Sequence, residues 1–311
     1  MTLTLLFAAP EALFPDYEAP LRAALHARGL GQAQLVTDVA AQEVDYIIYA
    51  PASRLQDFGP YTRCKAVLNL WAGVERIVPN TTLTQPLARM VDPALTQGMV
   101  EYVTGHVLRY HLGMEAHFRA APGAWEQVEP PLAHERPVGI LGAGELGQAC
   151  ARALMGLGFD VQLWGRSARE SPGLVLQHGA TGLEAVLRRS QILVTLLPHT
   201  PQTENLLDAP RLAQLPRGAF VINPGRGALI DDLALLAALD TGQIAHATLD
   251  VFRTEPLPAD HPYWHHPNVT VTPHIAAATR PTTASEVIAE NIARGEQGLP
   301  FLHLVDRSRG Y

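Results

Sequence analysis

Three glycines, Gly142, Gly144 and Gly147, constrain the fold of this chain more than any other feature of its sequence. They follow a short apolar run, Val138–Leu141, and precede a helical pattern that extends to Gly158. This order of strand, glycine-rich turn and helix start is typical of the βαβ unit that binds dinucleotides. The first glycine permits the tight turn, the second lets the backbone approach a pyrophosphate, and the third lets the helix pack closely on the strand.

We therefore expect a nucleotide site at this turn, with the free N–H groups of the helix start facing the phosphates. The residues predicted to contact the cofactor here are Gly142, Gly144, Glu145, Leu146 and Gly147. The alternative is an ordinary βα turn, because the chain contains 25 glycines and this spacing alone is a weak signal.

Bulk properties exclude several classes of protein. A length of 311 residues favours two domains, and a net charge of −7 without any basic run argues against a nucleic-acid partner. The apolar N-terminal run, Leu3–Ala9, is too short to span a membrane and lacks a basic flank, so we interpret it as a strand. The two cysteines, Cys64 and Cys150, form no metal or redox motif and suit a reducing compartment. We expect a cytoplasmic protein without a metal or a membrane partner.

Apolar runs alternate with helical patterns along the whole chain, which predicts two α/β domains with parallel sheets. In the first 100 residues the predicted strands are Leu3–Ala8, Gln34–Thr37, Asp45–Tyr49 and Ala66–Leu70, and the predicted helix is Tyr17–Arg28. After the glycine turn the predicted strands are Asp160–Trp164, Ile192–Leu196, Ala219–Asn223, Ala245–Val251 and Val269–Thr272, with a helix over Asp231–Thr241. The second group indicates a doubly wound sheet whose ligands bind beyond the carboxyl ends of the strands.

Two further helices set the predicted domain boundaries. A long helical pattern over about Gln97–Phe118 should connect the domains, and a last helix, Thr282–Gln297, should return to the first one. We expect residues 1–100 with 282–311 to form one domain, and residues 101–281 to form the dinucleotide-binding domain.

The turn after the second strand of the βαβ unit indicates which dinucleotide is bound. An acidic residue there would bind the ribose 2′-hydroxyl of NAD. Here the strand ends at Trp164 and continues Gly165-Arg166-Ser167-Ala-Arg169, with two arginines and no acid. Because a guanidinium suits a 2′-phosphate, we predict NADP(H) in preference to NAD(H), with Arg166, Ser167 and Arg169 as contacts. The alternative is that both arginines are solvated loop charges.

Three motifs follow predicted strands of the second domain and carry candidate catalytic residues. They are Asn223-Pro-Gly-Arg226-Gly227, Leu249-Asp250-Val-Phe-Arg-Thr-Glu255-Pro256 and Thr272-Pro-His274-Ile-Ala. Their shared place at strand ends predicts that all three converge on the cleft that holds the nucleotide. Alternatively, Arg226 is a structural charge and the acids only cap or pair. Nearby His261, His265 and His266 are expected to be ordinary loop residues.

The residue types in these motifs suit hydride transfer to a 2-oxo acid. Arg226 can bind the substrate carboxylate in a bidentate manner, and His274 can give a proton to the alkoxide that forms at C2. Glu255 would hold the ring of His274 and favour its protonated form. Asp250 could accept a hydrogen bond from the carboxamide of the nicotinamide. The stretch Asn69-Leu-Trp-Ala-Gly-Val74 is a strand end that can present backbone N–H groups to an anion.

Together these motifs resemble those of the D-isomer-specific 2-hydroxyacid dehydrogenase family, and most of all its bacterial glyoxylate/hydroxypyruvate reductase A group. The resemblance implies a Rossmann doubly wound domain and a smaller flavodoxin-like α/β substrate domain made from both termini. It implies that Arg226, Glu255 and His274 are catalytic, and that Leu197, Pro198 and Asp250 contact the cofactor. It also implies that Trp71, Ala72, Gly73 and Val74, with Arg226 and His274, bind substrate, and that the protein is a homodimer. The pair before Arg226, Pro224-Gly225, departs from the family pattern and leaves the pose of that turn open.

The sequence therefore predicts an NADPH-dependent reductase that converts glyoxylate to glycolate and hydroxypyruvate to D-glycerate. Two alternatives stay open. One is a reductase of a bulkier 2-oxo acid, since nothing in the sequence fixes the size of the pocket. The other is a nucleotide-sensing binding protein that resembles the transcriptional corepressors of this fold.

Overall fold

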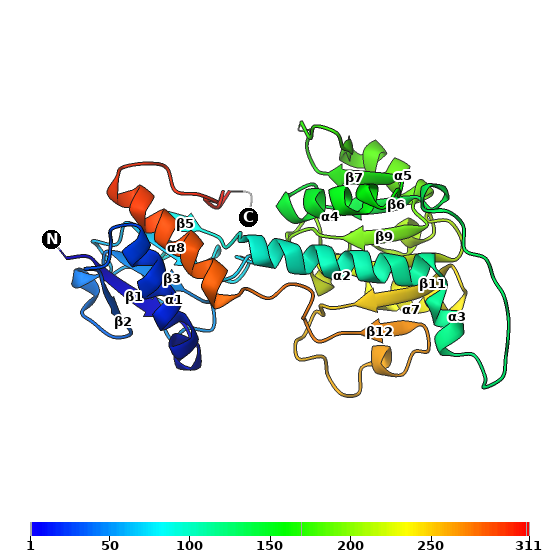
Figure 1. The fold of residues 1–311 in the computed structure, drawn as a ribbon, viewed down its shortest axis with the longest axis horizontal. Helices are drawn as coiled ribbons and strands as arrows, with labels where there is room; N and C mark the ends of the chain where they lie inside the picture. The colour runs from blue at the N-terminus through cyan, green and yellow to red at the C-terminus, as the bar shows by residue number, and fades with distance from the viewer. Residues whose placement is uncertain (1, 169, 309, 311) are drawn as a thin grey trace. The chain divides into compact units, whose positions relative to one another are not determined.

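The computed structural model describes residues 2–168, 170–308 and 310. The chain divides into two compact units, Met1–Leu95 with Ala278–Tyr311, and Thr96–Ala277 (Figure 1). We call them the first and the second unit. Each contains a parallel β-sheet covered by helices.

Within the described part of the first unit, five parallel strands pair in the order β2-β1-β3-β4-β5. The strands are β1 (Thr4–Ala8), β2 (Gln34–Val36), β3 (Tyr46–Tyr49), β4 (Ala66–Asn69) and β5 (Leu87–Ala88), and the helices are α1 (Phe14–Ala27) and α8 (Pro281–Glu296). Tyr17, Leu21, Ala24 and Leu25 of α1 recur at helical spacing and are buried, so α1 packs on the sheet through one face. Helix α8 lies beside α1 although it is more than 250 residues later in the chain, and Arg28 after α1 forms an ion pair with Glu286 of α8 at 2.6 Å.

Within the described part of the second unit, seven parallel strands pair in the order β12-β11-β10-β9-β6-β7-β8. The strands are β6 (Val138–Leu141), β7 (Val161–Gly165), β8 (Val175–His178), β9 (Ile192–Thr195), β10 (Ala219–Asn223), β11 (Ile244–Leu249) and β12 (Val269–Val271). The helices are α2 (Pro93–His111, which begins in the first unit), α3 (Met114–Phe118), α4 (Glu145–Gly156), α5 (Gly179–Arg189), α6 (Ala209–Leu212) and α7 (Asp232–Asp240). The strand order reverses direction at β6 and β9, the topological switch point where open α/β sheets bind ligands.

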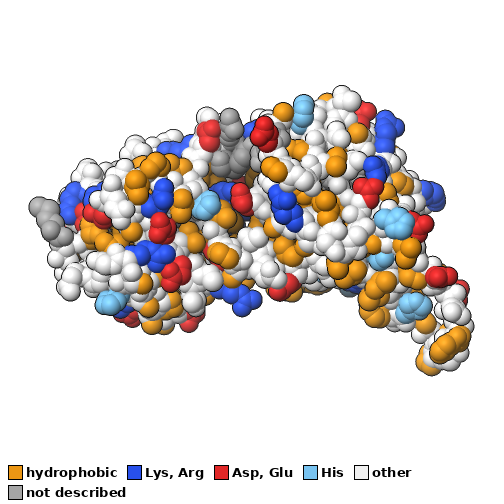
Figure 2. Space-filling view, turned by 45° about the horizontal axis from the view of Figure 1, so that its top comes forward, with side chains coloured by type: hydrophobic (Ala, Val, Ile, Leu, Met, Phe, Trp, Pro, Cys, Tyr) orange, Lys and Arg blue, Asp and Glu red, His pale blue; other side chains and the backbone are white. Residues whose placement is uncertain are grey.

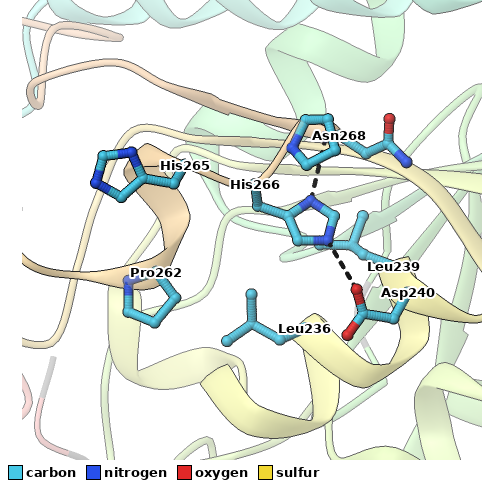
Figure 3. A pocket seen from close by; sticks show the side chains of 8 residues that line it. Leu236, Leu239, Asp240, Pro262, His265, His266 and Asn268 are labelled. Carbon is cyan, nitrogen blue, oxygen red and sulfur yellow. Dashed lines mark hydrogen bonds and ion pairs between the residues drawn. The ribbon is translucent and has the colours of Figure 1, made fainter.

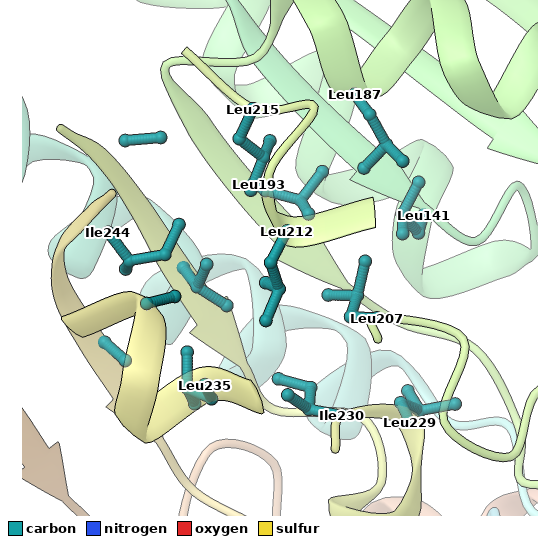
Figure 4. Close-up of a cluster of buried hydrophobic side chains, with 14 of the residues drawn as sticks. Leu141, Leu187, Leu193, Leu207, Leu212, Leu215, Leu229, Ile230, Leu235 and Ile244 are labelled. Atoms are coloured by element: carbon teal, nitrogen blue, oxygen red, sulfur yellow. The ribbon is translucent and has the colours of Figure 1, made fainter. Parts of the chain in front are cut away.

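Successive residues of the central strands enter two different hydrophobic cores. Leu193 and Val221 pack with α5, α6 and α7 in the cluster of Figure 4. Their neighbours Val194 and Ile222 pack with α2 and α4 on the other face. Because both faces are covered, these strands are apolar throughout and do not alternate with polar residues, which is why the sequence signals them clearly.

The predicted fold class, a Rossmann sheet and a flavodoxin-like sheet, is confirmed, but one predicted helix is wrong. The pattern over residues 97–118 forms two helices, α2 and α3, separated at Gly113. Gly113 has a φ of +66°, the left-handed conformation in which glycine commonly ends a helix. The short strands β5 and β8 are also absent from the sequence-based prediction. No helix in the described ranges is both long enough and apolar enough to cross a membrane.

Candidate active site

The predicted functional residues of the second unit follow six neighbouring strands of one sheet. Arg226 follows β10, Asp250 and Glu255 follow β11, His274 follows β12, Leu197 and Pro198 follow β9, Gly142–Gly147 follow β6, and Arg166 and Ser167 follow β7. All pairs among these strands are parallel. The strands therefore end at the same edge, and this edge contains the switch point between β6 and β9. The structure thus brings the predicted residues to one side of the sheet, where ligands of this fold bind.

The glycine turn has the geometry that a dinucleotide site requires. Gly142 has a φ of +131°, and a Cβ there would lie 2.7 Å from the carbonyl carbon of Leu196. A Cβ on Gly147 would overlap the carbonyl oxygen of Gly142, so helix α4 could not pack so close to the turn. In contrast, a Cβ on Gly144 would meet no atom within 4 Å. Gly142 and Gly147 are therefore required for the packing of the turn and helix, whereas the space beside Gly144 is open to a ligand.

Helix α4 begins directly after this open position. Gly144 is its N-cap residue and has no side chain that could accept from the first-turn N–H groups. These groups and the positive end of the helix favour an anion. Glu145, the first helical residue, is exposed, and Leu146 is half-buried. The residues present therefore fit the pyrophosphate of a dinucleotide.

The turn that is predicted to select the cofactor is accessible. Arg166 and Ser167 follow β7 and are exposed, and Leu197 and Pro198 after β9 are half-buried. Arg169, the other predicted contact of the 2′-phosphate, lies outside the described residues.

His274 and Glu255 form a close pair. The Nδ1 atom of His274 lies 2.7 Å from Oε2 of Glu255, and Oε1 of the same carboxylate accepts from the backbone N–H of Phe252 at 2.9 Å. An ionised carboxylate can only accept, so Nδ1 carries a proton and Nε2 is the nitrogen left for proton exchange. The His274 side chain is 53% exposed. Its φ of +53° is uncommon for a residue other than glycine.

The turn that carries Arg226 is fixed by Asn223, which the sequence analysis left without a role. The buried amide of Asn223 donates to the Arg226 carbonyl at 3.0 Å and accepts from the Gly225 N–H at 3.1 Å. A Cβ on Gly227 would overlap the backbone of Phe252, so this turn lies against the start of the segment that leads to Glu255. The open question about the Pro224-Gly225 pair thus has a local answer in the hydrogen bonds of Asn223.

Asp250 is completely buried, and its carboxylate accepts hydrogen bonds from the segment that carries His274. The donors are the Thr272 hydroxyl at 2.6 Å and the backbone N–H groups of Ile275 and Ala276, both at 2.9 Å. The observed contacts of Asp250 are therefore supports of the His274 segment. Its predicted contact with the nicotinamide stays a prediction.

In the first unit, the segment Trp71–Val74 is organised by Asn69, which the sequence analysis did not select. Asn69 ends β4 and is 1% exposed. Its Nδ2 atom donates to the carbonyls of Trp71 and Gly73 at 2.7 and 3.0 Å. In a trans peptide the N–H points away from the C=O. The N–H groups of Ala72 and Val74 are thus turned away from Asn69, as an anion-binding loop requires.

The pocket in Figure 3, about 550 Å³ in volume, lies elsewhere in the second unit. Its lining residues include the end of α7 and Pro267 and Asn268, which directly precede β12. It is therefore at the amino edge of the sheet, opposite the glycine turn. His266 in this pocket accepts from the Asn268 N–H at 3.1 Å and faces Asp240 at 3.4 Å. These are local contacts of a loop histidine.

The family model for the NAD-binding domain of D-isomer specific 2-hydroxyacid dehydrogenases matches residues 106–276. The chain belongs to this family. Glyoxylate/hydroxypyruvate reductase A of Yersinia enterocolitica is 39% identical over 279 residues, which cover 87% of this chain and 88% of that protein.

Two solved structures are similar over the whole chain. The D-isomer specific 2-hydroxyacid dehydrogenase of Xanthobacter autotrophicus Py2, in complex with NADPH and MES, has a TM-score of 0.93 and 39% identity, covering 100% of both chains. The NADPH-dependent glyoxylate/hydroxypyruvate reductase of Sinorhizobium meliloti, with NADP and sulfate, has a TM-score of 0.86 and 34% identity, also covering 100% of both chains. The predicted family and the predicted class, an oxidoreductase, are confirmed. Both solved relatives contain the phosphorylated cofactor that the arginines after β7 predict.

Proposed function

We propose that this 2-hydroxyacid dehydrogenase reduces small 2-oxo acids with NADPH, with glyoxylate and hydroxypyruvate as its first substrates. The observation that carries the proposal is the 2.7 Å His274–Glu255 pair at the same sheet edge as a glycine turn with an open position for a pyrophosphate. The named relatives support the substrate class, because each has one third or more of its aligned residues in common with this chain.

Each catalytic residue has a separate task in this proposal. NADPH, when bound, supplies the hydride that C2 of the substrate accepts. Arg226 binds the substrate carboxylate, and His274 donates a proton from Nε2 to the C2 oxygen, since Nδ1 is held by Glu255. Glu255 keeps the ring in one orientation and offsets the charge of the imidazolium. The products are glycolate and D-glycerate.

The two units are proposed to have different roles. The second unit binds the dinucleotide, with Arg166, Ser167 and Arg169 at the 2′-phosphate, and Leu197, Pro198 and Asp250 as further contacts. In the first unit, Trp71, Ala72, Gly73 and Val74 bind the substrate carboxylate through the backbone. A cytoplasmic location, as the cysteines indicate, stays a prediction.

We also propose that the protein is a homodimer, and the segment after α3 supports this. It projects from the second unit in Figure 1, and Figure 2 shows hydrophobic side chains at its tip. Phe118, the last residue of α3, and Trp125, Val128 and Leu132 of the segment are between 63% and 94% exposed. Large apolar side chains gathered on a projecting segment are typical of an interface. Light scattering should give twice the mass of the chain, and a monomer at micromolar concentration would contradict the homodimer.

The function is tested by following NADPH consumption with a panel of 2-oxo acids of increasing size. We expect the highest kcat/KM with glyoxylate and hydroxypyruvate, and little turnover with NADH. A higher kcat/KM with bulky 2-oxo acids would favour the alternative substrate class, and NADPH binding without any turnover would contradict the reductase. His274→Ala should lower kcat by about 100-fold or more and leave the Kd for NADPH nearly unchanged. Wild-type turnover in that variant would remove His274 from the mechanism.

A further inference from the structure

A chain of two hydrogen bonds connects helix α2 with the buried Asp250. The Tyr102 hydroxyl of α2 lies 2.7 Å from Oγ1 of Thr272, and that oxygen lies 2.6 Å from Oδ1 of Asp250. The carboxylate is an acceptor only, so the single proton of the Thr272 hydroxyl goes to Asp250. The proton between Tyr102 and Thr272 must then come from Tyr102. The direction of the whole chain is therefore fixed, from Tyr102 to Thr272 to Asp250.

Asp250 holds the backbone of His274 and of the two residues that follow it. Its carboxylate accepts from the N–H groups of Ile275 and Ala276, and its main-chain carbonyl accepts from the His274 N–H at 2.9 Å. His274 itself has a φ of +53°, a conformation that residues with a Cβ adopt only where the surroundings impose it. The orientation of this one carboxylate thus determines how the catalytic imidazole is presented.

The surroundings of Tyr102 keep its hydroxyl a permanent donor. Burial raises the pKa of Tyr102 well above its ordinary value, since the phenolate would lose its solvation. The ring also contacts the ring of His106, one turn further along α2, with centroids 4.5 Å apart. Tyr102 is consequently fixed in place and protonated at any pH at which the enzyme would work.

We propose that Tyr102 and Thr272 are positioning residues for His274, acting through the carboxylate of Asp250. This proposal rests on the proposed function, because it assigns His274 the proton transfer. Without the Thr272 hydroxyl, Asp250 loses one of three donors and can rotate. Without the Tyr102 hydroxyl, Thr272 can rotate away from Asp250. Either change would loosen the segment 272–276 and reduce the fraction of molecules with His274 correctly placed.

The first test compares Tyr102→Phe with Tyr110→Phe. Tyr110 lies two turns further along the same helix and is hydrogen-bonded to Thr248 at 2.5 Å, within strand β11 and not in the His274 segment. We expect Tyr102→Phe to lower kcat by about 3- to 10-fold, the loss of one net hydrogen bond. The KM and the Kd for NADPH should change by less than about 2-fold, since no ligand contact is removed. Tyr110→Phe should keep the wild-type kcat, although it removes an even shorter hydrogen bond from the same helix.

The second test uses Thr272. Thr272→Val should lower kcat by the same order as Tyr102→Phe, and Thr272→Ser, which keeps the hydroxyl, should restore it. The double variant Tyr102→Phe/Thr272→Val should be no slower than Thr272→Val alone, because both act through one chain. Wild-type kcat in Tyr102→Phe, equal losses in Tyr102→Phe and Tyr110→Phe, or fully additive effects would each overturn the proposal.

A readout independent of turnover separates this proposal from the proposed function. Amide hydrogen exchange of a peptide covering residues 272–276 should be roughly 5-fold faster or more in Tyr102→Phe than in the wild type and in Tyr110→Phe. If the wild type reduces no 2-oxo acid, the proposed function fails, and the exchange rates still decide whether Tyr102 and Thr272 hold the segment. Unchanged exchange in Tyr102→Phe would show that they do not.

Discussion

Replacing Gly144 by alanine separates the two explanations of the glycine turn. A Cβ at this position meets no protein atom within 4 Å, and the backbone, with φ −78° and ψ −171°, is one that alanine adopts readily. If the turn only connects β6 with α4, the variant should behave as the wild type. If a pyrophosphate lies against the turn, the added methyl group occupies the space of the cofactor.

The expected magnitudes follow from the local structure. Alanine reduces the entropy of the unfolded chain, which stabilises the fold by about 0.4–1 kcal/mol. As the N-cap residue of α4 it is less favourable than glycine, which costs about 0.5–1 kcal/mol. These terms nearly cancel, so Tm should stay within about 2 °C of the wild type. An overlap with the cofactor should cost about 1–3 kcal/mol, and the Kd for NADPH should then rise by about 5- to 150-fold.

Gly147→Ala is the matched variant, because its Cβ would overlap the backbone of Gly142. Backbone cannot yield as a flexible side chain can, so we expect a loss of about 3 kcal/mol and a Tm lower by about 6–12 °C. Differential scanning fluorimetry gives Tm, and isothermal titration of NADPH gives Kd. Wild-type affinity in a fully folded Gly144→Ala protein would refute the cofactor site. An unchanged Tm in Gly147→Ala would refute the packing argument.

Four further outcomes are expected. Arg226→Ala should lower kcat/KM for glyoxylate by about 100-fold, mainly through a higher KM. Arg226→Lys should recover only part of this loss, because a single ammonium cannot bind a carboxylate in a bidentate manner. Equal kinetics of the lysine variant and the wild type would argue against the bidentate contact. Asn69→Ala should raise KM about 10-fold without changing the Kd for NADPH, since it removes the side-chain donor shared by the carbonyls of Trp71 and Gly73. Steady-state kinetics and titration of NADPH check this, and an unchanged KM would contradict it. Arg166→Ala should raise the Kd for NADPH, but not for NADH, by about 10-fold or more; parallel losses for both cofactors would exclude the 2′-phosphate contact. Burial lowers the pKa of His106 to about 4, so between about pH 6.5 and 4 the unfolded chain binds a proton that the folded chain excludes. The free energy of unfolding, measured by urea denaturation, should therefore fall by about 2 kcal/mol from about pH 7 to 5. His106→Gln should make this free energy depend less steeply on pH.

The residues that the sequence analysis selected share one physical property. Each follows a short apolar run that forms a strand. Most of these strands are buried on both faces, as Ile192–Thr195 and Ala219–Asn223 are, while the strand before His274, Val269–Val271, is half-buried at the sheet edge. Such runs are visible in a single sequence, and parallel strands bring their carboxyl ends to one edge. A reader of the sequence can therefore place Arg226 and His274 on the same side of a sheet without knowing any distance.

Other features had no comparable signal. Gly113 stands inside a helical pattern, and only its φ of +66° shows that it ends one helix before another begins. Strand β8, Val175–His178, is an edge strand with half-exposed side chains, so it lacks the continuous apolar run of the central strands. Tyr102 and Thr272 are 170 positions apart, and their hydrogen bond depends on the packing of α2 against the sheet. Periodicity predicts that α2 is a helix, but it does not predict which hydroxyl faces which strand.

Asn69, Asn223 and Asp250 play a similar part in the structure. All three are buried at or just beyond the end of a strand, and each donates to or accepts from the segment that follows it or lies beside it. A buried polar side chain that lost these bonds would be strongly destabilising, so each one restricts its neighbouring segment to the few conformations that satisfy it. The half-buried Arg226 and the exposed His274 thus stand on backbone that these buried side chains hold. A reactive side chain needs a defined backbone position, and in this chain the buried polar residues at the strand ends supply it through hydrogen bonds to the neighbouring main chain.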